Sequence, residues 1–307
     1  MSTIQPALST VSLHHLPWPQ VLDAARDSGF TAIELLMIPG WVHVAPQRVS
    51  AAEIRQEFRT RGLRLIGVHG GGLDGSSEEM LSGTLAYLGR LLPVAAAAGA
   101  AFLNINGMHV PAGTTPVQRR QMLERIIHGL RVLEPQVRAL GMQVTLENHA
   151  HCHIATPEDY QVILDAFPLP EHAWLGATVD TGHFHLSQVD LIPAIHSLRG
   201  RVLHVHVKDH RGEHSVPLGT GTIDNLGAVR ALRAAGYHGH LSCELELGDA
   251  TQSVAAVRQA MPYLQQLISS TSLPASTANA ATSPTAATIT STTPTRTRDA
   301  ALSQESV

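Results

Sequence analysis

The segment LGMQVTLENH, residues 140–149, contains the pattern from which the fold can be inferred. Gly141 follows a helical stretch, at the position where a left-handed residue commonly ends a helix. The run Gln143–Leu146 is short, apolar and typical of a buried strand. Glu147 comes directly after that run. A helix end, a glycine, a strand and a polar residue at the strand's end together form one structural unit.

The same unit recurs along most of the chain. Apolar runs predict eight strands, at Leu8–Leu13, Ala32–Met37, Leu63–Val68, Ala101–Ile105, Gln143–Leu146, Leu175–Val179, Val202–Val207 and His240–Leu245. Predicted helices lie between or after them, at Trp18–Ser28, Ala51–Arg61, Ser77–Ala98, Pro116–Leu140, Pro157–Ala166, Leu191–Leu198, Asn225–Ala235 and Thr251–Ile268. Glycines come after several of these helices, at Gly29, Gly62, Gly99, Gly141 and Gly236.

Eight units over about 268 residues average roughly 33 residues each, which is usual for a barrel. A doubly wound open sheet would normally carry a glycine-rich dinucleotide turn after its first strand, and no such turn comes after Leu13. We therefore predict an α/β fold, a (β/α)8 TIM barrel, over residues 1–269. Residues 270–307 are rich in Ser, Thr, Ala and Pro without apolar periodicity, and we predict that they form a disordered C-terminal tail.

Composition narrows the classes of function. Hydrophobic residues make up 44% of the chain, charged residues 15%, and the net charge is -4. This balance argues against a large basic surface for nucleic acid. Cys152 and Cys243 lie too far apart for a redox or zinc motif. We expect no secretory signal, no membrane span and a cytoplasmic protein, and the sequence leaves open whether it forms a homo-oligomer.

Four consecutive predicted strands end in a metal-ligating residue: Glu147, Asp180, His206 and Glu244. Their separations are 33, 26 and 38 residues, each about one strand–helix unit. In a barrel this spacing brings the four side chains together at the C-terminal mouth, where active sites of this fold lie. Three carboxylates at one mouth would repel each other without a cation. The set suits one divalent ion, Mn²⁺, Mg²⁺ or Co²⁺, without excluding Zn²⁺.

The segments around these residues resemble a known superfamily. They are Leu-Glu-Asn-His at 146–149, Val-Asp-Thr-Gly-His at 179–183, His-Val-Lys-Asp at 206–209, Cys-Glu-Leu-Glu at 243–246 and Gly-Thr-Gly-Thr-Ile-Asp at 219–224. In this order they are similar to the sugar phosphate isomerase/epimerase superfamily, the xylose isomerase-like barrels that also include endonuclease IV. The resemblance covers about residues 7–268.

The resemblance implies a divalent-metal-dependent isomerase or epimerase that acts on a small sugar or polyhydroxy ketone through an enediolate. In ketose 3-epimerases of this group the four ligands hold one ion, and two glutamates exchange protons with the substrate, which here implies Glu147 and Glu244. The resemblance further implies that His183 and Arg211 bind substrate oxygens. Those epimerases tend to have another glutamate shortly after the first ligand, where this chain has His151 and His153.

Three alternatives remain at this point. A dehydratase of the inosose or dehydroshikimate type uses the same ligand set for β-elimination. An endonuclease IV-like phosphodiesterase needs further zinc ions, for which His69 and His109 are candidates because they come after the third and fourth strands. The same two histidines are otherwise candidates for binding substrate. A barrel that binds a ligand without catalysis is the last alternative.

Two further positions have no assigned chemistry. For Glu34, near the end of the second strand, the resemblance implies a side chain that faces the pocket, and a solvated charge is the alternative. Lys208 and Asp209 are expected to form a local ion pair.

Overall fold

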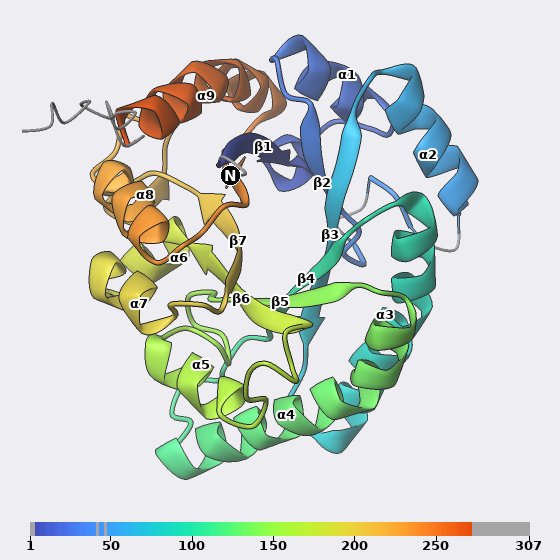
Figure 1. Cartoon of the computed structure of the whole chain (residues 1–307), viewed down its shortest axis with the longest axis vertical. Coiled ribbons are helices and arrows are strands. Elements are labelled where there is room, and N and C mark those ends of the chain that lie inside the picture. Colours follow the sequence, from blue (N-terminus) through green and yellow to red (C-terminus); the bar gives the residue numbers. More distant parts are fainter. Residues whose placement is uncertain (1–3, 41–42, 46–47, 272–307) are drawn as a thin grey trace, which may run out of the picture. The chain divides into compact units, whose positions relative to one another are not determined.

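The computed structural model describes residues 4–40, 43–45 and 48–271. Within them, eight parallel strands close into a barrel in the order β1-β10-β7-β6-β5-β4-β3-β2 (Figure 1). The barrel strands are β1 Gln5–Ser9, β2 Ala32–Leu36, β3 Arg64–Leu73, β4 Phe102–Gly107, β5 Gln143–Glu147, β6 Leu175–Asp180, β7 Val202–Val207 and β10 His240–Cys243. The predicted TIM barrel is confirmed. The predicted tail lies outside the described residues from residue 272 onward.

Helices surround the barrel, as Figure 1 shows. They are α1 Gln20–Asp27, α2 Ala51–Thr60, α3 Glu78–Ala98, α4 Pro116–Ala139, α5 Pro157–Leu164, α6 Thr181–Leu186, α7 Leu191–Ser197, α8 Asn225–Ala234 and α9 Ala250–Ser270. The glycines at 29, 62, 99, 141 and 236 all have positive φ, between 64° and 102°, as their predicted place after a helix requires. Side-chain caps at Ser50, Thr115 and Thr156 begin three of the helices.

The first strand differs from its prediction. It covers Gln5–Ser9, and Thr10–Leu13 form a short 3-10 helix (η1) in place of further strand. In this segment polar side chains take the place of backbone hydrogen bonds between strands. Thr10 Oγ1 accepts a hydrogen bond from Leu36 N at 2.8 Å. Ser12 Oγ likewise donates to Cys243 O and accepts from Leu245 N. The apolar run Leu8–Leu13 therefore ends as a polar-anchored turn at the barrel mouth.

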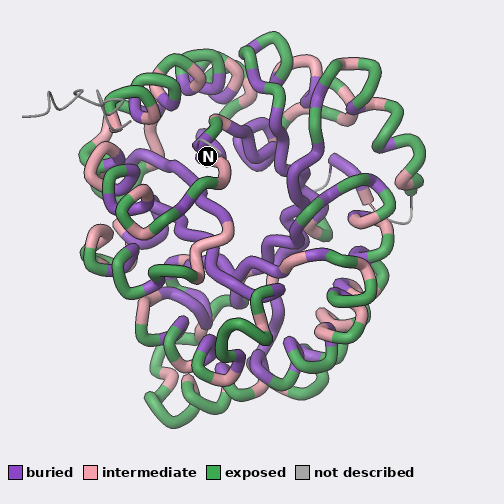
Figure 2. The backbone as a smooth tube through the Cα atoms, viewed as in Figure 1, coloured by how far each residue is buried: buried purple, intermediate pink, exposed green. Residues whose placement is uncertain are grey.

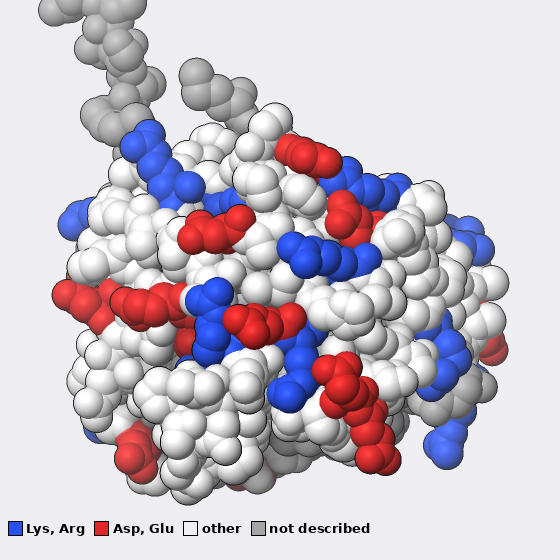
Figure 3. Space-filling model, turned by 90° about the horizontal axis from the view of Figure 1, so that it is seen from below, with Lys and Arg blue, Asp and Glu red and all other residues white. Residues whose placement is uncertain are grey.

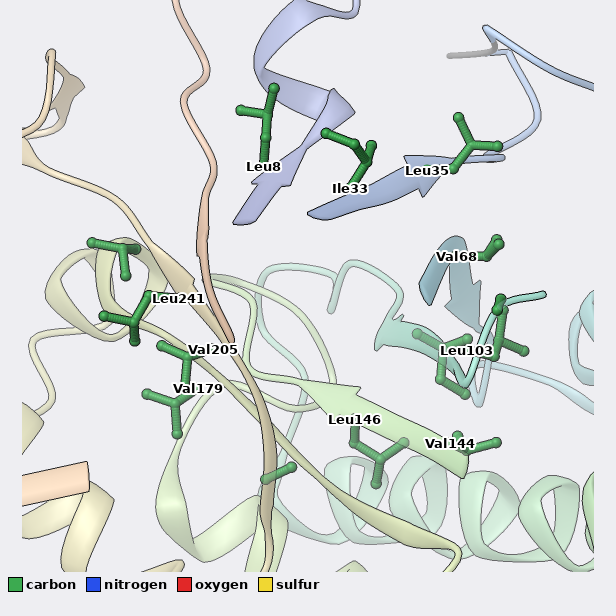
Figure 4. Close-up of a cluster of buried hydrophobic side chains, with 14 of the residues drawn as sticks. Leu8, Ile33, Leu35, Val68, Leu103, Val144, Leu146, Val179, Val205 and Leu241 are labelled. Atoms are coloured by element: carbon green, nitrogen blue, oxygen red, sulfur yellow. The ribbon is translucent and has the colours of Figure 1, made fainter. Parts of the chain in front are cut away.

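Alternate residues of each strand face opposite sides of the barrel wall. One set packs beneath the helices, and Figure 4 shows ten of its members pointing away from the barrel centre: Leu8, Ile33, Leu35, Val68, Leu103, Val144, Leu146, Val179, Val205 and Leu241. The other set faces the interior. A separate small cluster, Ala7, Ala32, Ile66 and Phe102, fills the interior near the starts of its strands. Polar side chains occupy the interior positions nearer the strand ends.

Burial matches this layering. Figure 2 shows buried residues along the strands and the inner faces of the helices, and exposed residues along the outer faces. In the described part of the chain, α3 is the one helix long and apolar enough to cross a membrane. Length and composition alone are weak evidence, because core helices of soluble proteins pass the same test. Leu81, Leu88, Leu91 and Leu92 of this helix are buried in the protein.

The surface carries charges of both signs. In the view of Figure 3, Arg side chains lie interspersed with Asp and Glu side chains. This face of the molecule therefore has no continuous basic patch of the kind that a phosphate backbone requires.

Candidate metal centre

The four predicted ligands meet at the C-terminal mouth of the barrel. Glu147 ends β5, Asp180 ends β6, His206 lies in β7 and Glu244 comes directly after β10. One ligand atom from each lies within 4.8 Å of the others. All four side chains are at most 2% exposed. The spacing seen in the sequence thus becomes a single buried cluster because neighbouring barrel strands bring their ends together.

The histidine lies at the centre of this cluster. His206 Nδ1 is 2.7 Å from Glu147 Oε1, 3.3 Å from Glu244 Oε2 and 3.7 Å from Asp180 Oδ2. Asp180 Oδ2 and Glu244 Oε2 are buried and accept no hydrogen bond among the described residues, and their contacts are the ion pairs with Lys208 Nζ at 3.2 Å and His206 Nδ1 at 3.3 Å. Buried anionic oxygens of this kind normally have a donor or a cation beside them. The donor set, three carboxylates and one imidazole, fits a divalent ion.

Two cations offset the carboxylates within the chain itself. Burial lowers the pKa of His206, but the charges of Glu244, Glu34 and Glu147 outweigh burial and raise that pKa well above its usual value. Burial raises the pKa of Asp180, but the charge of Lys208 and then of His183 outweighs burial and lowers that pKa well below its usual value. Without an ion, the cluster is therefore held by a protonated imidazole and an ammonium group.

Lys208 is the ammonium group in question. Its Nζ lies 3.2 Å from Asp180 Oδ2, 3.0 Å from Glu244 Oε1 and 2.8 Å from Glu246 Oε1. The expected ion pair with Asp209 is wrong, because the Lys208 ammonium pairs with Asp180, Glu244 and Glu246. The Asp209 carboxylate instead accepts hydrogen bonds from the backbone N–H groups of His210, Gly219, Gly221 and Ile223. It anchors the loop between β7 and α8.

Sequence reasoning missed the role of Lys208, although the composition carried a signal. It is the only lysine in the chain, whose other twenty basic residues, of 21 Lys and Arg, are arginines. Its ammonium group has three donors, and three carboxylates lie within 3.2 Å of it. A lone lysine directly after a strand that carries a ligand is therefore informative.

A pocket of about 150 Å³ opens beside the cluster. Its lining residues are Val11, Ile38, His69, Asn106, Glu147, His149, His183, Glu244 and Glu246. His183 lies in α6, a short helix that the sequence did not predict, whose first turn is capped by Asp180 Oδ1 at 2.8 Å from His183 N. Burial, and then the charge of Lys208, lower the pKa of His183 to about 3, so that its imidazole is neutral.

The predicted substrate-binding residues separate into two pairs. His69 and His183 line the pocket, and His69 Nε2 lies 3.3 Å from Glu147 Oε2. His109 and Arg211 are exposed and are not among the residues that line it. The backbone of His109 bridges to Cys152, and Arg211 lies in β8 (His210–Arg211), which pairs with β9 (His214–Ser215). Arg211 Nη2 donates to Thr220 O at 2.6 Å.

Asn104 is a further residue that the sequence did not reveal. Its Oδ1 accepts hydrogen bonds from Thr145 Oγ1 at 3.0 Å and Thr178 Oγ1 at 2.8 Å. Its Nδ2 is thereby directed to Glu147 Oε2, to which it donates at 3.0 Å. Asn148 joins the ends of β5 and β6 in a similar way, through both backbone polar groups of Asp180. The inward position of Asn104 is explained by strand alternation, but the partners of both asparagines depend on barrel register.

Glu34 corresponds to neither of its two expected roles. It is fully buried in the interior, and its Oε2 lies 2.7 Å from His206 Nε2 and 3.0 Å from His204 Nε2. Among the described residues, the groups able to hold a metal are this trio and the cluster of Glu147, Asp180, His206 and Glu244. Neither group includes His69 or His109, which leaves the multi-zinc alternative without a ligand set there.

Comparison with known proteins places these observations in context. The sequence profile described as a xylose isomerase-like TIM barrel matches residues 22–267. An inosose dehydratase of Lacticaseibacillus casei is 26% identical over 143 residues, which are 40% of this chain and 47% of that protein. The match therefore spans about half the length of that curated relative.

Solved structures share the fold. The IolI protein, solved with a bound zinc atom, superposes with a TM-score of 0.74 and 16% identity, over 87% of this chain and 99% of that one. An L-ribulose 3-epimerase superposes with a TM-score of 0.71 and 18% identity, over 88% and 96% of the two chains. At these identities the likeness concerns the fold alone.

Proposed function

Because this chain belongs to the xylose isomerase-like TIM barrel family, we propose that it is a divalent-metal-dependent isomerase or epimerase of a small sugar or polyhydroxy ketone. One observation carries the proposal: two buried glutamates, Glu147 and Glu244, belong to one candidate metal cluster and also line one small pocket. Proton transfer next to a carbonyl needs such carboxylates beside a group that stabilises the developing negative charge.

The metal would be held by Glu147, Asp180, His206 and Glu244. When bound, a divalent ion supplies Lewis acidity that polarises a carbonyl and an adjacent hydroxyl. The IolI protein, which shares this fold, was solved with a bound zinc atom, and this supports the proposal of a metal. The oxygen-rich donor set of this chain also suits Mn²⁺, Mg²⁺ or Co²⁺.

The protein's own groups divide the remaining work. Glu147 and Glu244 are the candidates to remove a proton from a substrate carbon and to return one. His183 is neutral and lines the pocket, which makes its ring a hydrogen-bonding partner for a substrate oxygen. Val11 and Ile38 give the pocket an apolar side. The small volume, about 150 Å³, favours a small substrate.

A dehydratase is the second candidate, and the inosose dehydratases among the sequence relatives favour it. Dehydration and isomerisation both begin with removal of a proton next to a carbonyl. The two reactions differ in their second step, because a dehydratase expels a neighbouring hydroxyl as water and an isomerase returns the proton.

Elemental mass spectrometry and product analysis test these proposals together. Protein purified without chelator is expected to hold about one divalent ion per chain, and Glu147→Gln to lose it. Ketoses and cyclic polyhydroxy ketones are then incubated in D₂O. A product of unchanged composition with solvent deuterium on carbon indicates an isomerase or epimerase, and loss of one water indicates the dehydratase. Absence of metal after reconstitution with Mn²⁺ or Co²⁺ would overturn both.

A further inference from the structure

We infer that Glu34 is a positioning residue that fixes the His206 ring with Nδ1 facing the other three metal ligands. Glu34 lies in β2, on a different part of the barrel from β7, and contacts the ring from beneath the cluster. The inference rests on the proposed function, because it requires that the four ligands bind a metal. It gives a role to Glu34, which is not itself one of those ligands.

The two nitrogens of His206 have different partners. Nε2 is 2.7 Å from Glu34 Oε2, whereas Nδ1 is 2.7 Å from Glu147 Oε1 and 3.3 Å from Glu244 Oε2. A carboxylate is only an acceptor, so the contact with Glu34 places a hydrogen on Nε2. In the neutral ring the lone pair then belongs to Nδ1, on the side of Glu147, Asp180 and Glu244. Hydrogen bonds of this kind set the tautomer and orientation of metal-bound histidines.

His204 holds the Glu34 carboxylate in place. Its Nε2 lies 3.0 Å from the same Oε2 atom, and its ring packs on Phe102 with the ring centroids 4.5 Å apart. Glu34, His204 and His206 are at most 1% exposed, so water does not compete for these hydrogen bonds. Both histidines occupy interior positions of β7, because residues two apart in a strand share a face. His204 thus holds the Glu34 carboxylate, and that carboxylate in turn holds the ring of His206.

Glu34, His204 and His206 are also a candidate for a second metal site, but the distances between their atoms favour direct hydrogen bonds over a bound ion. Each histidine Nε2 is at hydrogen-bond distance from one shared carboxylate oxygen, 2.7 and 3.0 Å. An ion bound among these atoms would need to lie about 2.0–2.2 Å from each of them. The number of ions per chain separates the two interpretations.

The decisive experiment measures Co²⁺ affinity by chelator competition for the wild type, Glu34→Gln and Ser9→Ala. Ser9 lies opposite Glu34 in the β1–β2 register, is fully buried, and has no hydrogen-bond partner for its Oγ among the described residues, which makes it a matched interior control. We expect Glu34→Gln to weaken Co²⁺ binding about 10–100-fold. Ser9→Ala should change it less than about threefold. Circular dichroism confirms that each variant is folded.

Equal affinity in Glu34→Gln and the wild type would overturn the inference while leaving the proposed function intact. Two ions per chain, with one lost in Glu34→Gln, would overturn it in favour of a second metal site. A wild type that binds no ion defeats the proposed function and this inference with it. Nitrogen-15 NMR of the wild-type Zn²⁺ form provides a test without a variant: hydrogen on His206 Nε2 and metal on Nδ1 support the inference, and metal on Nε2 overturns it.

Discussion

Lys208 gives the metal-free site an internal counter-charge. Its ammonium group contacts Asp180, Glu244 and Glu246, and its side chain is 1% exposed. Removing one partner from a buried ionic network leaves the remaining charges uncompensated, which is costly. The fold is therefore expected to be stable without a metal ion.

The variant Lys208→Met tests this role. We expect the metal-free variant to lose about 3–5 kcal/mol of unfolding free energy, because three carboxylates lose their shared cation. Saturating Mn²⁺ should restore part of the loss, so the rise in melting temperature from EDTA to Mn²⁺ should be larger than in the wild type. Arg120→Met removes an exposed cation that pairs with Glu124 and serves as the control, with a change within about 0.5 kcal/mol. An equal Mn²⁺ effect in Lys208→Met and wild type would contradict the role.

His183 should make the stability of the metal-free protein depend on pH. Burial and the charge of Lys208 lower its pKa from 6.5 to about 3 in the folded state. Between these values the unfolded chain binds a proton that the folded chain does not, so stability falls as pH decreases through this window. Urea unfolding in EDTA at several pH values should show this slope, and His183→Asn should reduce it. An unchanged slope in the variant would show that His183 is not its source.

At the scale of secondary-structure elements, the conformation of the loop between β7 and α8 is held by a single carboxylate, that of Asp209. The Asp209 carboxylate accepts hydrogen bonds from four backbone N–H groups. Its Oδ2 atom accepts two of them, from Gly219 N and Gly221 N, at 2.9 Å each. Gly221 approaches so closely that an added Cβ would lie 2.1 Å from Asp209 Oδ1. The glycine-rich loop is therefore shaped by close backbone approach to this side chain.

Asp209→Ala should release this loop. We expect a loss of about 1–3 kcal/mol in unfolding free energy, because the four backbone donors lose their acceptor. Hydrogen exchange of residues 210–223 should speed up, while the candidate metal ligands keep their positions on β5, β6, β7 and after β10. Metal stoichiometry measured on the same sample provides the control. Slow exchange throughout the loop of the variant would show that other contacts hold it.

Helix and strand boundaries show what local sequence specifies. The glycines after helices were predicted correctly because a left-handed residue is a local requirement, as Gly99 with a φ of 102° illustrates. The first strand was predicted too far along because Thr10 and Ser12 bond to residues more than twenty positions away. Helix α6 was missed because its cap, Asp180, is also a predicted metal ligand.

In the molecule as a whole, the two faces of the barrel wall have separate duties. The outward face packs under the helices and stabilises the fold, whereas the inward face positions polar groups near the strand ends. Leu103 in β4 faces outward and is fully buried, and its neighbour Asn104 faces inward toward Glu147. One strand thus serves stability and the candidate site with consecutive residues.

Leu103→Ala should separate these duties. The cavity and the lost burial are expected to cost about 2–5 kcal/mol of unfolding free energy, measured by urea denaturation. Metal stoichiometry of the folded variant should stay unchanged, because the side chain points away from the cluster. Loss of metal from a folded Leu103→Ala protein would contradict the separation of the two faces.

The barrel, and the meeting of Glu147, Asp180, His206 and Glu244 at its mouth, could be predicted from the amino-acid sequence. Apolar periodicity and helix-ending glycines are local signals, and a closed parallel barrel brings all its strand ends to one mouth whatever the details of packing. Four ligands spaced one unit apart therefore converge in any barrel of this design.

The residues that support those ligands became known only from the folded arrangement. Glu34 and His206 are 172 residues apart, and Asn104 and Glu147 are 43 apart, so their pairing depends on strand register and on which interior residues lie at the same level. The positions of His109 and Arg211 outside the pocket lining depend on loops whose course periodicity does not encode. Hydrogen bonds across a barrel are set by the closed sheet as a whole, and no single segment contains the information to specify them.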